Sequence, residues 1–297
     1  ATALYIVAFY PAMSQVAYEI VRALGFFDGR KWSALRGSLV VALVFQVFYE
    51  IFDASLPRLG AGDDASTLWA LNTLLDLREQ NGSGSQTDGL RILDVGCGNG
   101  AQTLQLARNV EGSIVALDNH PPFLAELERR ARAENLWQKI TPRCKDMHQL
   151  GEEDGRFDLV WAEGSLFVMG FRAGLETCSH RLADGGAMSV SELVWLRSDR
   201  PAECQEYFDT VYPAMSDLAA NEALISDSGL RLVDQFVLPE SAWWVEYYRP
   251  LEGRLELLRG KYTAYPDKLE MVGAIQTEID MYRRLSAFSG YAFFLME

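Results

Sequence analysis

The residues with the clearest chemical potential lie in the segment from Asp94 to Gly100, which reads Asp-Val-Gly-Cys-Gly-Asn-Gly. A short apolar run containing an acid leads into three glycines at alternate positions. This pattern predicts a buried parallel strand, then a tight turn where the backbone approaches a ligand closely, then a helix. Leu104, Ala107 and Val110 follow at helical spacing, so the N–H groups of the helix's first turn would face the strand end. We therefore expect this turn to hold a cofactor.

The glycine spacing and the acids favour one class of cofactor over another. A nicotinamide or flavin site uses Gly-x-Gly-x-x-Gly to place a pyrophosphate at the helix N-terminus. Here the spacing is Gly-x-Gly-x-Gly, and Asp94 stands just before it, which suits a cationic ammonium or sulfonium better than a diphosphate. Asp118, at the end of the second predicted strand, could accept both hydroxyls of a ribose, each charge-assisted bond contributing about 1.5–3 kcal/mol.

Composition excludes several other classes of function. The chain has 297 residues, 49% of them hydrophobic, which is enough for one large α/β domain with additions. Its 41 acidic against 27 basic residues give a formal charge of −14, so we do not expect a nucleic acid partner. The four cysteines form no CxxC pair and the three histidines are far apart in sequence. We therefore expect no metal site and no disulfide framework, which fits a reducing cytoplasm.

The N-terminal segment is unusually apolar. Its first eighteen residues carry no charge, but they lack a basic leader and are interrupted by Pro11, Ser14 and Gln15, unlike a secretion signal. A second uncharged run, 37–49, is too short to span a bilayer as a helix. We expect two apolar helices that pack on the domain or on a second copy, forming a homodimer. Membrane attachment is the alternative.

From residue 91 onward the pattern alternates between strands and helices. Residues 1–80 read as helical, with Leu68, Leu71, Leu74 and Leu75 in one stripe, and 81–89 is a joint of turn-forming residues. A helix from Phe171 is expected to stop at Gly185-Gly186, and another opens at Pro201 with Val211 facing inward. After the strand at 230–238, a helical insertion at 241–288 would form a lid before a final antiparallel strand. The predicted strands after the first are Ser113–Leu117, Ile140–Cys144, Phe157–Ala162, Ala187–Leu196, Leu230–Leu238 and Tyr291–Met296.

Together these motifs identify a resemblance to a known family. The run from Asp94 to Gly100, the acid ending the second strand, Asp146-Met147 after the third, and Glu163-Gly164 after the fourth resemble the class I S-adenosylmethionine-dependent methyltransferases. More narrowly, the chain is similar to a bacterial subgroup of uncharacterised small-molecule methyltransferases. The segments that carry this second similarity are Pro57-Arg58-Leu59-Gly60-Ala61-Gly62, Gly170-Phe171, Ser191-Glu192 with Trp195, Tyr212-Pro213, and Leu238-Pro239-Glu240 with Trp243 and Pro250.

The resemblance implies a fold and a division of the chain. The fold would be α/β and Rossmann-like, with a seven-stranded, mostly parallel sheet, helices on both faces and an antiparallel last pair of strands. Residues 1–47 would be an apolar extension, and 48–297 the methyltransferase domain. Within that domain we expect a lead-in at 48–89, a cofactor-binding core at 90–240, a lid at 241–288 and the last strand at 289–297.

The resemblance also implies roles for single residues. Asp94, Gly96, Gly98 and Gly100 would line the methionine portion of S-adenosylmethionine, with S-adenosylhomocysteine as the product. Asp118 would bind the ribose, Asn119 would lie beside the adenine, Asp146 would accept from its amino group, and Met147 would pack on its ring. Glu163 would face the methionine end or the substrate. Gln102 and Thr103, which open the first helix, are further candidates.

The acceptor side is less defined by the sequence. Glu163 and Glu192 stand at predicted carboxyl ends of strands, where they could orient or deprotonate a small-molecule acceptor. Trp195, Tyr212, Trp243, Tyr247 and Tyr248 could close a pocket over it, or could form the core of the lid. The sequence does not separate O, N and C acceptors, and a quinone-type acceptor stays open. The alternatives to a methyltransferase are a non-catalytic S-adenosylmethionine-binding protein and a nicotinamide-dependent oxidoreductase.

Overall fold

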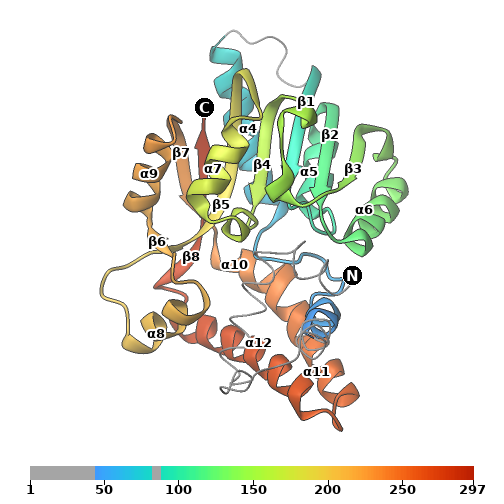
Figure 1. Cartoon of the computed structure of the whole chain (residues 1–297), viewed down its shortest axis with the longest axis vertical. Helices are drawn as coiled ribbons and strands as arrows, with labels where there is room; N and C mark the ends of the chain where they lie inside the picture. The colour runs from blue at the N-terminus through green and yellow to red at the C-terminus, as the bar shows by residue number, and fades with distance from the viewer. Residues whose placement is uncertain (1–43, 82–87) are drawn as a thin grey trace, which may run out of the picture.

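The alternating segments form one twisted sheet, with helices on both faces and a helical layer beyond the carboxyl ends of its central strands (Figure 1). The computed structural model describes residues 44–81 and 88–297. The expectations for the apolar N-terminal segment up to residue 43 lie outside these residues. The strands are β1 (Asp88–Val95), β2 (Glu111–Asp118), β3 (Ile140–Cys144), β4 (Phe157–Glu163), β5 (Leu182–Trp195), β6 (Ser216–Asp217), β7 (Leu232–Val237) and β8 (Ser289–Met296).

The sheet order is β3-β2-β1-β4-β5-β8-β7, and the short strand β6 pairs with β5 beside this path. Strands β1 to β5 are parallel, whereas β8 runs antiparallel between β5 and β7. The Rossmann-like, mostly parallel sheet and the antiparallel last pair are therefore confirmed. The sheet has eight strands, not the seven predicted, because β6 has only two residues, too few to leave a periodic signal.

Both faces of the sheet are covered by helices, because its strands carry apolar side chains on both faces. Helices α4 (Asp64–Gln80), α5 (Ala101–Asn109) and α6 (Pro121–Ala133) cover one face, and α7 (Phe171–Ser179) and α9 (Leu218–Asp227) cover the other. Neighbouring side chains of β1 divide between the two faces: Ile92 packs under α4, whereas Leu93 and Val95 belong to the core under α7. The parallel central strands therefore have their carboxyl ends together at the same end of the sheet.

Two local expectations are wrong. Helix α7 ends at Ser179, and Gly185 and Gly186 lie inside β5 instead of stopping a helix. They lie where the register between β4 and β5 shifts and the two strands approach closely. A Cβ on Gly186 would lie 3.0 Å from the carbonyl oxygen of Phe157 on β4. Val211, expected to face inward from α8 (Ala202–Val211), is 45% exposed because it is the last residue of that helix.

Between β7 and β8 the chain builds a separate helical layer. It consists of α10 (Glu240–Trp243), the π-helical turn η5 (Trp244–Tyr248), α11 (Arg249–Lys261) and α12 (Pro266–Leu285). In Figure 1 this layer lies below the sheet, beyond the carboxyl ends of the central strands. It has its own core, in which Tyr248, Leu255 and Ile279 pack with Val47 and Ile51 of the helical segment 44–51.

Four short 3-10 helices complete the described chain: η1 (Trp137–Lys139), η2 (Met147–Gln149), η3 (Glu152–Asp154) and η4 (Leu166–Val168). No helix among residues 44–81 and 88–297 combines the length and apolarity needed to span a bilayer.

We predict that Gly100→Ala destabilises the protein by about 3 kcal/mol. Gly100 has a φ of 87°, and a Cβ there would lie 2.2 Å from the Leu127 Cδ1, so left-handed strain of about 1–2 kcal/mol adds to overpacking of about 1–3 kcal/mol. The matched control is Gly253→Ala in α11, where a Cβ meets nothing within 4 Å. This control is expected to gain about 0.5–1 kcal/mol. Urea unfolding measures both, and equal effects would contradict the role assigned to Gly100.

Candidate functional site

The glycine turn is held by the end of the neighbouring strand. The amides of Gly96 and Cys97 both donate to the carbonyl oxygen of Leu117, at 2.8 and 2.9 Å, and the amide of Gly98 donates to Asp118 Oδ2 at 3.0 Å. Gly96 and Gly98 have φ values of 73° and 54°, a region that L side chains rarely adopt. The turn therefore presents bare backbone at the carboxyl edge of β1 and β2.

Asp94 is fully buried beneath this turn. Its carboxylate accepts a hydrogen bond from the Thr103 hydroxyl at 2.6 Å and one from Gln102 Nε2 at 3.3 Å. Burial, together with the nearby negative charges of Glu163 and Asp118, raises the pKa of Asp94 to about 7, against the lowering effect of these two hydrogen bonds. Gln102 and Thr103, predicted as cofactor contacts, thus bind the carboxylate through which α5 is joined to β1.

Asp118 lies half-buried at the carboxyl end of β2, with its side chain bent back over the turn. Its second oxygen, Oδ1, accepts from the amide of His120 at 2.8 Å. Burial raises the pKa of Asp118 to about 6, against these backbone hydrogen bonds. Asn119 follows, half-buried. The imidazole of His120 stacks on Tyr49 at 3.6 Å between centroids, and burial lowers its pKa to about 4, so this histidine is neutral at pH 7.

The loop after β3 brings a third predicted pair to the turn. Met147 is close enough that a Cβ added to Gly96 would lie 3.3 Å from its methyl group. Asp146 Oδ1 accepts from the amide of His148 at 2.9 Å and pairs with its Nδ1 at 2.8 Å. The structure therefore brings together Asp94, Asp118, Met147 and the glycines, with Asp146 at the start of the same short helix as Met147.

Glu163 ends β4 and is buried against three donors. Its oxygens accept from the Thr67 hydroxyl at 2.7 Å and the Trp161 indole Nε1 at 2.8 Å, and lie 3.5 Å from Arg58 Nη1. Burial raises the pKa of Glu163, while the positive charge of Arg58 opposes the rise. The side chain is thus fixed in place on the α4 side, next to the turn.

Arg58 is a site residue to which the sequence assigned no role. Its side chain is only 4% exposed and contacts three carboxylates: Asp64 at 2.7 Å, Glu246 at 2.9 Å and Glu163. These acids belong to α4, the helical layer and the sheet, so one guanidinium joins all three parts. No feature of the sequence indicated this role of Arg58, because two of its three partners are 105 and 188 residues away.

The segment that carries Arg58, residues 54–59, crosses the glycine turn and is called the crossing segment below. Asn99 Nδ2 donates to the carbonyl oxygens of Ala54 and Leu56, at 3.1 and 2.6 Å. The side chain of Leu59 lies over the turn as well, 3.1 Å from the position of a Cβ on Gly98. Asn99 therefore anchors this crossing segment directly above the predicted cofactor contacts.

Glu192 lies on β5, farther from the turn, and is 2% exposed. Its Oε1 accepts from the Tyr212 hydroxyl and from the amide of Leu193, both at 3.0 Å. Burial raises the pKa of Glu192 to about 7, against these two hydrogen bonds. The carboxyl group is therefore poised between its two protonation states near neutral pH.

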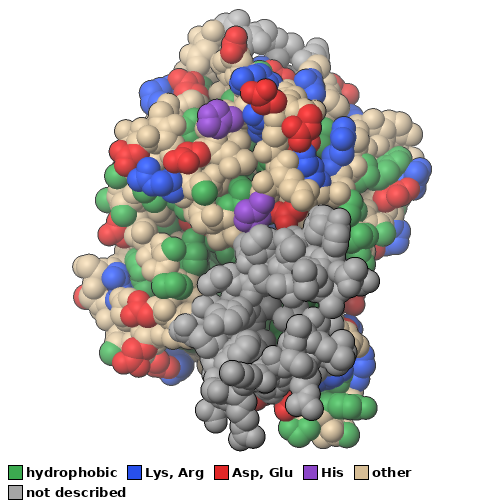
Figure 2. Space-filling model, viewed as in Figure 1, with side chains coloured by type: hydrophobic (Ala, Val, Ile, Leu, Met, Phe, Trp, Pro, Cys, Tyr) green, Lys and Arg blue, Asp and Glu red, His purple; other side chains and the backbone are tan. Residues whose placement is uncertain are grey.

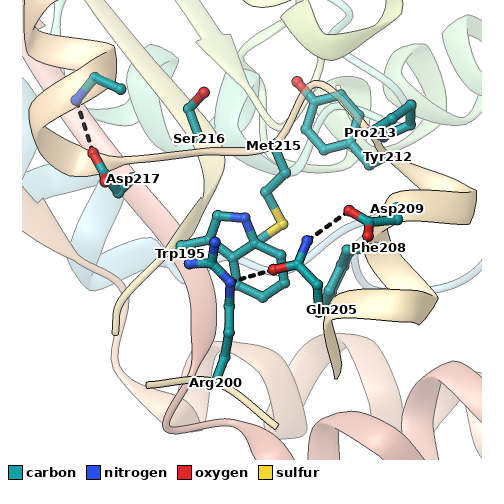
Figure 3. A pocket seen from close by; sticks show the side chains of 11 residues that line it. Trp195, Arg200, Gln205, Phe208, Asp209, Tyr212, Pro213, Met215, Ser216 and Asp217 are labelled. Atoms are coloured by element: carbon teal, nitrogen blue, oxygen red, sulfur yellow. Dashed lines mark hydrogen bonds between the residues drawn. The ribbon is translucent and has the colours of Figure 1, made fainter. Parts of the chain in front are cut away.

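The predicted pocket residues separate into two groups. Trp195 and Tyr212 line a hollow of about 240 Å³ beside α8, where the Arg200 guanidinium lies 4.2 Å from the Trp195 ring (Figure 3). Trp243 and Tyr247 belong instead to the core of the helical layer. Tyr212 joins the hollow to Glu192, because its ring lines the hollow while its hydroxyl donates to Glu192 Oε1.

Charges of both signs are interspersed over the sheet half of the face drawn in Figure 2. Among the described residues, no group of three or more His, Cys, Asp or Glu side chains is placed to hold a metal ion.

The sheet order, the glycine turn and the acids at its two sides define the fold of the class I S-adenosylmethionine-dependent methyltransferases. Residues 92–186 match the family model described as a methyltransferase domain. The chain is similar in structure to a methyltransferase from Geobacter sulfurreducens solved with S-adenosylhomocysteine (TM-score 0.67, 19% identity, 85% of this chain and 97% of that one). A second, from Thiobacillus denitrificans, gives a TM-score of 0.68 at 17% identity, covering 85% and 98%.

Curated relatives are similar in sequence over part of their length. A sterol 24-C-methyltransferase of Gibberella zeae is 26% identical over 183 residues, 58% of this chain and 47% of that protein. A 27-O-demethylrifamycin SV methyltransferase of Amycolatopsis mediterranei is 26% identical over 168 residues, 54% and 59%. The matched part is thus about half the length of these relatives.

We predict that Asp94 makes the free protein less stable as the pH rises from about 4 to about 7. Its pKa is raised in the folded state, so the folded protein holds a proton there that the unfolded chain has lost, and raising the pH favours unfolding until Asp94 is ionised. Urea unfolding of Asp94→Asn should lack this contribution, so the stability of the parent relative to the variant falls across that window and is level above it.

The control is Asp267→Asn, at the exposed first turn of α12, which should keep the profile of the parent. The raised pKa of Asp94 would be contradicted if the free energy of unfolding of the parent minus that of Asp94→Asn stayed constant from pH 4 to 8.

Proposed function

We propose that this chain transfers the methyl group of S-adenosylmethionine to a small-molecule acceptor by in-line displacement. The observation that carries the proposal is the pair of carboxylates at the two sides of the glycine turn, Asp94 fully buried and Asp118 half-buried. Such an arrangement suits a ligand with a cation at one end and a diol at the other. The family match and the fold support the same reading.

The residues present fit this cofactor in the groups that they offer. Glycine is required at position 96 because a Cβ there would lie 2.5 Å from Ser165 Cβ and 3.3 Å from the Met147 methyl group. The groups are right in kind: two carboxylates can accept hydrogen bonds from the ammonium and the ribose hydroxyls, and a thioether side chain can pack against a ring. When bound, the cofactor supplies a methyl group on a positively charged sulfur.

The chain's own residues would perform binding and alignment. Asp94 would hold the ammonium end, Asp118 the ribose, and Asn119, Asp146 and Met147 the adenine. Glu163, fixed by Thr67 and Trp161, would mark the methionine end. Alignment of the nucleophile with the methyl group could contribute roughly 7–11 kcal/mol to lowering the barrier.

A small acceptor suits the position of the helical layer. The layer lies beyond the carboxyl ends of the strands and is joined to Glu163 through Arg58 and Glu246, so we infer that it acts as a lid over the acceptor. The proposed domain extends over 48–297, with this lid at 241–288. The names of the sterol and rifamycin relatives describe small-molecule substrates, and a net charge of −14 disfavours nucleic acid.

We predict that Asp118→Asn weakens binding of S-adenosylhomocysteine by roughly 10- to 150-fold. Loss of the charge removes about 1.5–3 kcal/mol from hydrogen bonds to the ribose. Titration calorimetry with the full chain measures the affinity, and circular dichroism checks that the variant is folded. The control is Asp227→Asn at the exposed end of α9, which should bind like the parent. Parent-like affinity of Asp118→Asn, or no binding by the parent, would overturn the proposed function.

A further inference from the structure

Glu163 and Asp94 lie on the same face of two neighbouring strands. The parallel register pairs Asp94 of β1 with Trp161 of β4, and Glu163 stands two residues farther along β4, beside the glycine turn. Trp161 packs in the core beneath α4, and side chains two residues apart on a strand share a face. The α4 side of the turn therefore has two carboxyl groups, at the end where we place the ammonium of S-adenosylmethionine.

The two carboxyl groups differ in what they leave free. Asp94 is fully buried, and each of its oxygens already accepts a hydrogen bond from α5. Oε1 of Glu163 accepts from two neutral donors, in Thr67 and Trp161. Within residues 44–81 and 88–297, the one partner of Oε2 is the Arg58 guanidinium, 3.5 Å away. Oε2 is therefore the acceptor with spare capacity on this side of the turn.

Arg58 is held in position by two other carboxylates. Its Nη2 lies 2.7 Å from Asp64 Oδ1 and its Nε lies 2.9 Å from Glu246 Oε2, so that Nη1 is left to Glu163. The side chains of Asp64 and Glu246 are 51% and 40% exposed, whereas those of Arg58 and Glu163 are 4% and 6% exposed. Because water screens exposed charges more than buried ones, the attraction between Arg58 and Glu163 is the least screened of the three.

Bare backbone lies beside the buried pair. A Cβ on Gly62 would lie 3.1 Å from Arg58 Nη1 and 3.4 Å from Glu163 Oε2. The Gly62 amide donates to the carbonyl oxygen of Ala242 in α10 at 3.1 Å, which holds this backbone in place. A larger residue at position 62 would crowd both partners, so glycine there lets the guanidinium and the carboxylate meet.

We propose that Arg58 is a positioning residue for methyl transfer: it keeps Glu163 ionised, so that Oε2 can accept from the ammonium group of S-adenosylmethionine. A carboxylate attracts an ammonium, whereas a protonated carboxyl group does not. Without Arg58, burial would favour the protonated form of Glu163. This inference rests on the proposed function and assigns a role in it to a residue outside the glycine turn.

The charged groups that face Glu163 are otherwise negative in the described chain. Burial raises the pKa of Glu163, and the positive charge of Arg58 opposes this rise. Asp63, which caps α4, acts in the opposite direction to Arg58, and Asp94 faces Glu163 from the neighbouring strand. The two outer partners of Arg58 are acids as well. Removal of Arg58 would therefore raise the pKa of Glu163 further.

Glu192 shows what burial does where a cation is lacking. It is 2% exposed and accepts two hydrogen bonds, but no Lys, Arg or His of the described residues forms an ion pair with it. Burial raises its pKa to about 7. We expect Glu163 to behave alike once Arg58 is removed, so that about nine in ten of its carboxyl groups are protonated at pH 6.

The test measures the affinity of the full chain for two compounds by titration calorimetry. S-adenosylhomocysteine carries the ammonium, whereas 5′-methylthioadenosine has the same adenine and ribose but lacks the amino-acid portion. We expect Arg58→Met to bind S-adenosylhomocysteine about tenfold more weakly than the parent at pH 6. It should bind 5′-methylthioadenosine as the parent does, which also shows that the variant is folded.

The deficit of Arg58→Met should depend on pH with a definite sign. As the pH rises to about 8, Glu163 ionises in the variant and the affinity for S-adenosylhomocysteine should return to within about twofold of the parent. Arg58→Lys keeps the positive charge and should remove most of the deficit at pH 6. A deficit that is equal at both pH values, or equal for the two replacements, would overturn the proposal.

Glu163→Gln tests the carboxylate directly and does not depend on the folding of an Arg58 variant. We expect it to weaken S-adenosylhomocysteine binding about tenfold at pH 8, and adding Arg58→Met to it should cost less than about twofold more. Parent-like affinity of Glu163→Gln, or a full further loss in the double variant, would refute the role of Arg58.

Arg108→Met is the matched control. Arg108 of α5 also lies near Asp64, at 3.4 Å, but its closer partner is Glu134, at 2.7 Å. This variant should bind both compounds like the parent at pH 6 and pH 8, and a deficit like that of Arg58→Met would count against the proposal. If the parent binds neither compound, the proposed function itself fails.

Discussion

The attachment of the glycine turn to the end of β2 is the constraint on which the rest of the structure depends. Three successive amides, of Gly96, Cys97 and Gly98, are committed to Leu117 and Asp118. This fixes the backbone in left-handed conformations that expose it at the sheet edge. The Gly98 amide also holds the Asp118 side chain against the turn. The pairing of β1 with β2 therefore also fixes the geometry of the site.

Burial of carboxylates is the second constraint, and the protein treats them in different ways. Asp94 is held by hydrogen bonds from α5, whereas Glu163 has a buried guanidinium beside it. Glu192 and Glu278 have only tyrosine hydroxyls and backbone. Since an unpaired buried charge is costly, burial raises the pKa of both acids and favours their protonated forms.

The helical layer and the crossing segment are coupled to the sheet through few polar contacts. Arg58 joins α4, β4 and the layer, and Asn99 anchors the segment that carries it. Because Arg58 contacts Glu163 at the edge of the site, changes in the charge around Glu163 would be felt by Glu246 in the layer. The arrangement links the end of β4 and the helical layer through a single buried side chain.

The sequence by itself determined the alternation of strands and helices, the glycine turn and the acids at two strand ends, because these depend on local periodicity and on spacing within one turn. It misjudged Gly185-Gly186, where pairing with β4 overrode a local stop signal, and it missed β6, which is too short to show a period. Only the tertiary structure decided that Arg58 meets Glu163 and Glu246, that Glu192 meets Tyr212, and that Glu278 meets Tyr248. Those contacts join residues 20 to 188 positions apart, and such separations leave no trace in a single sequence.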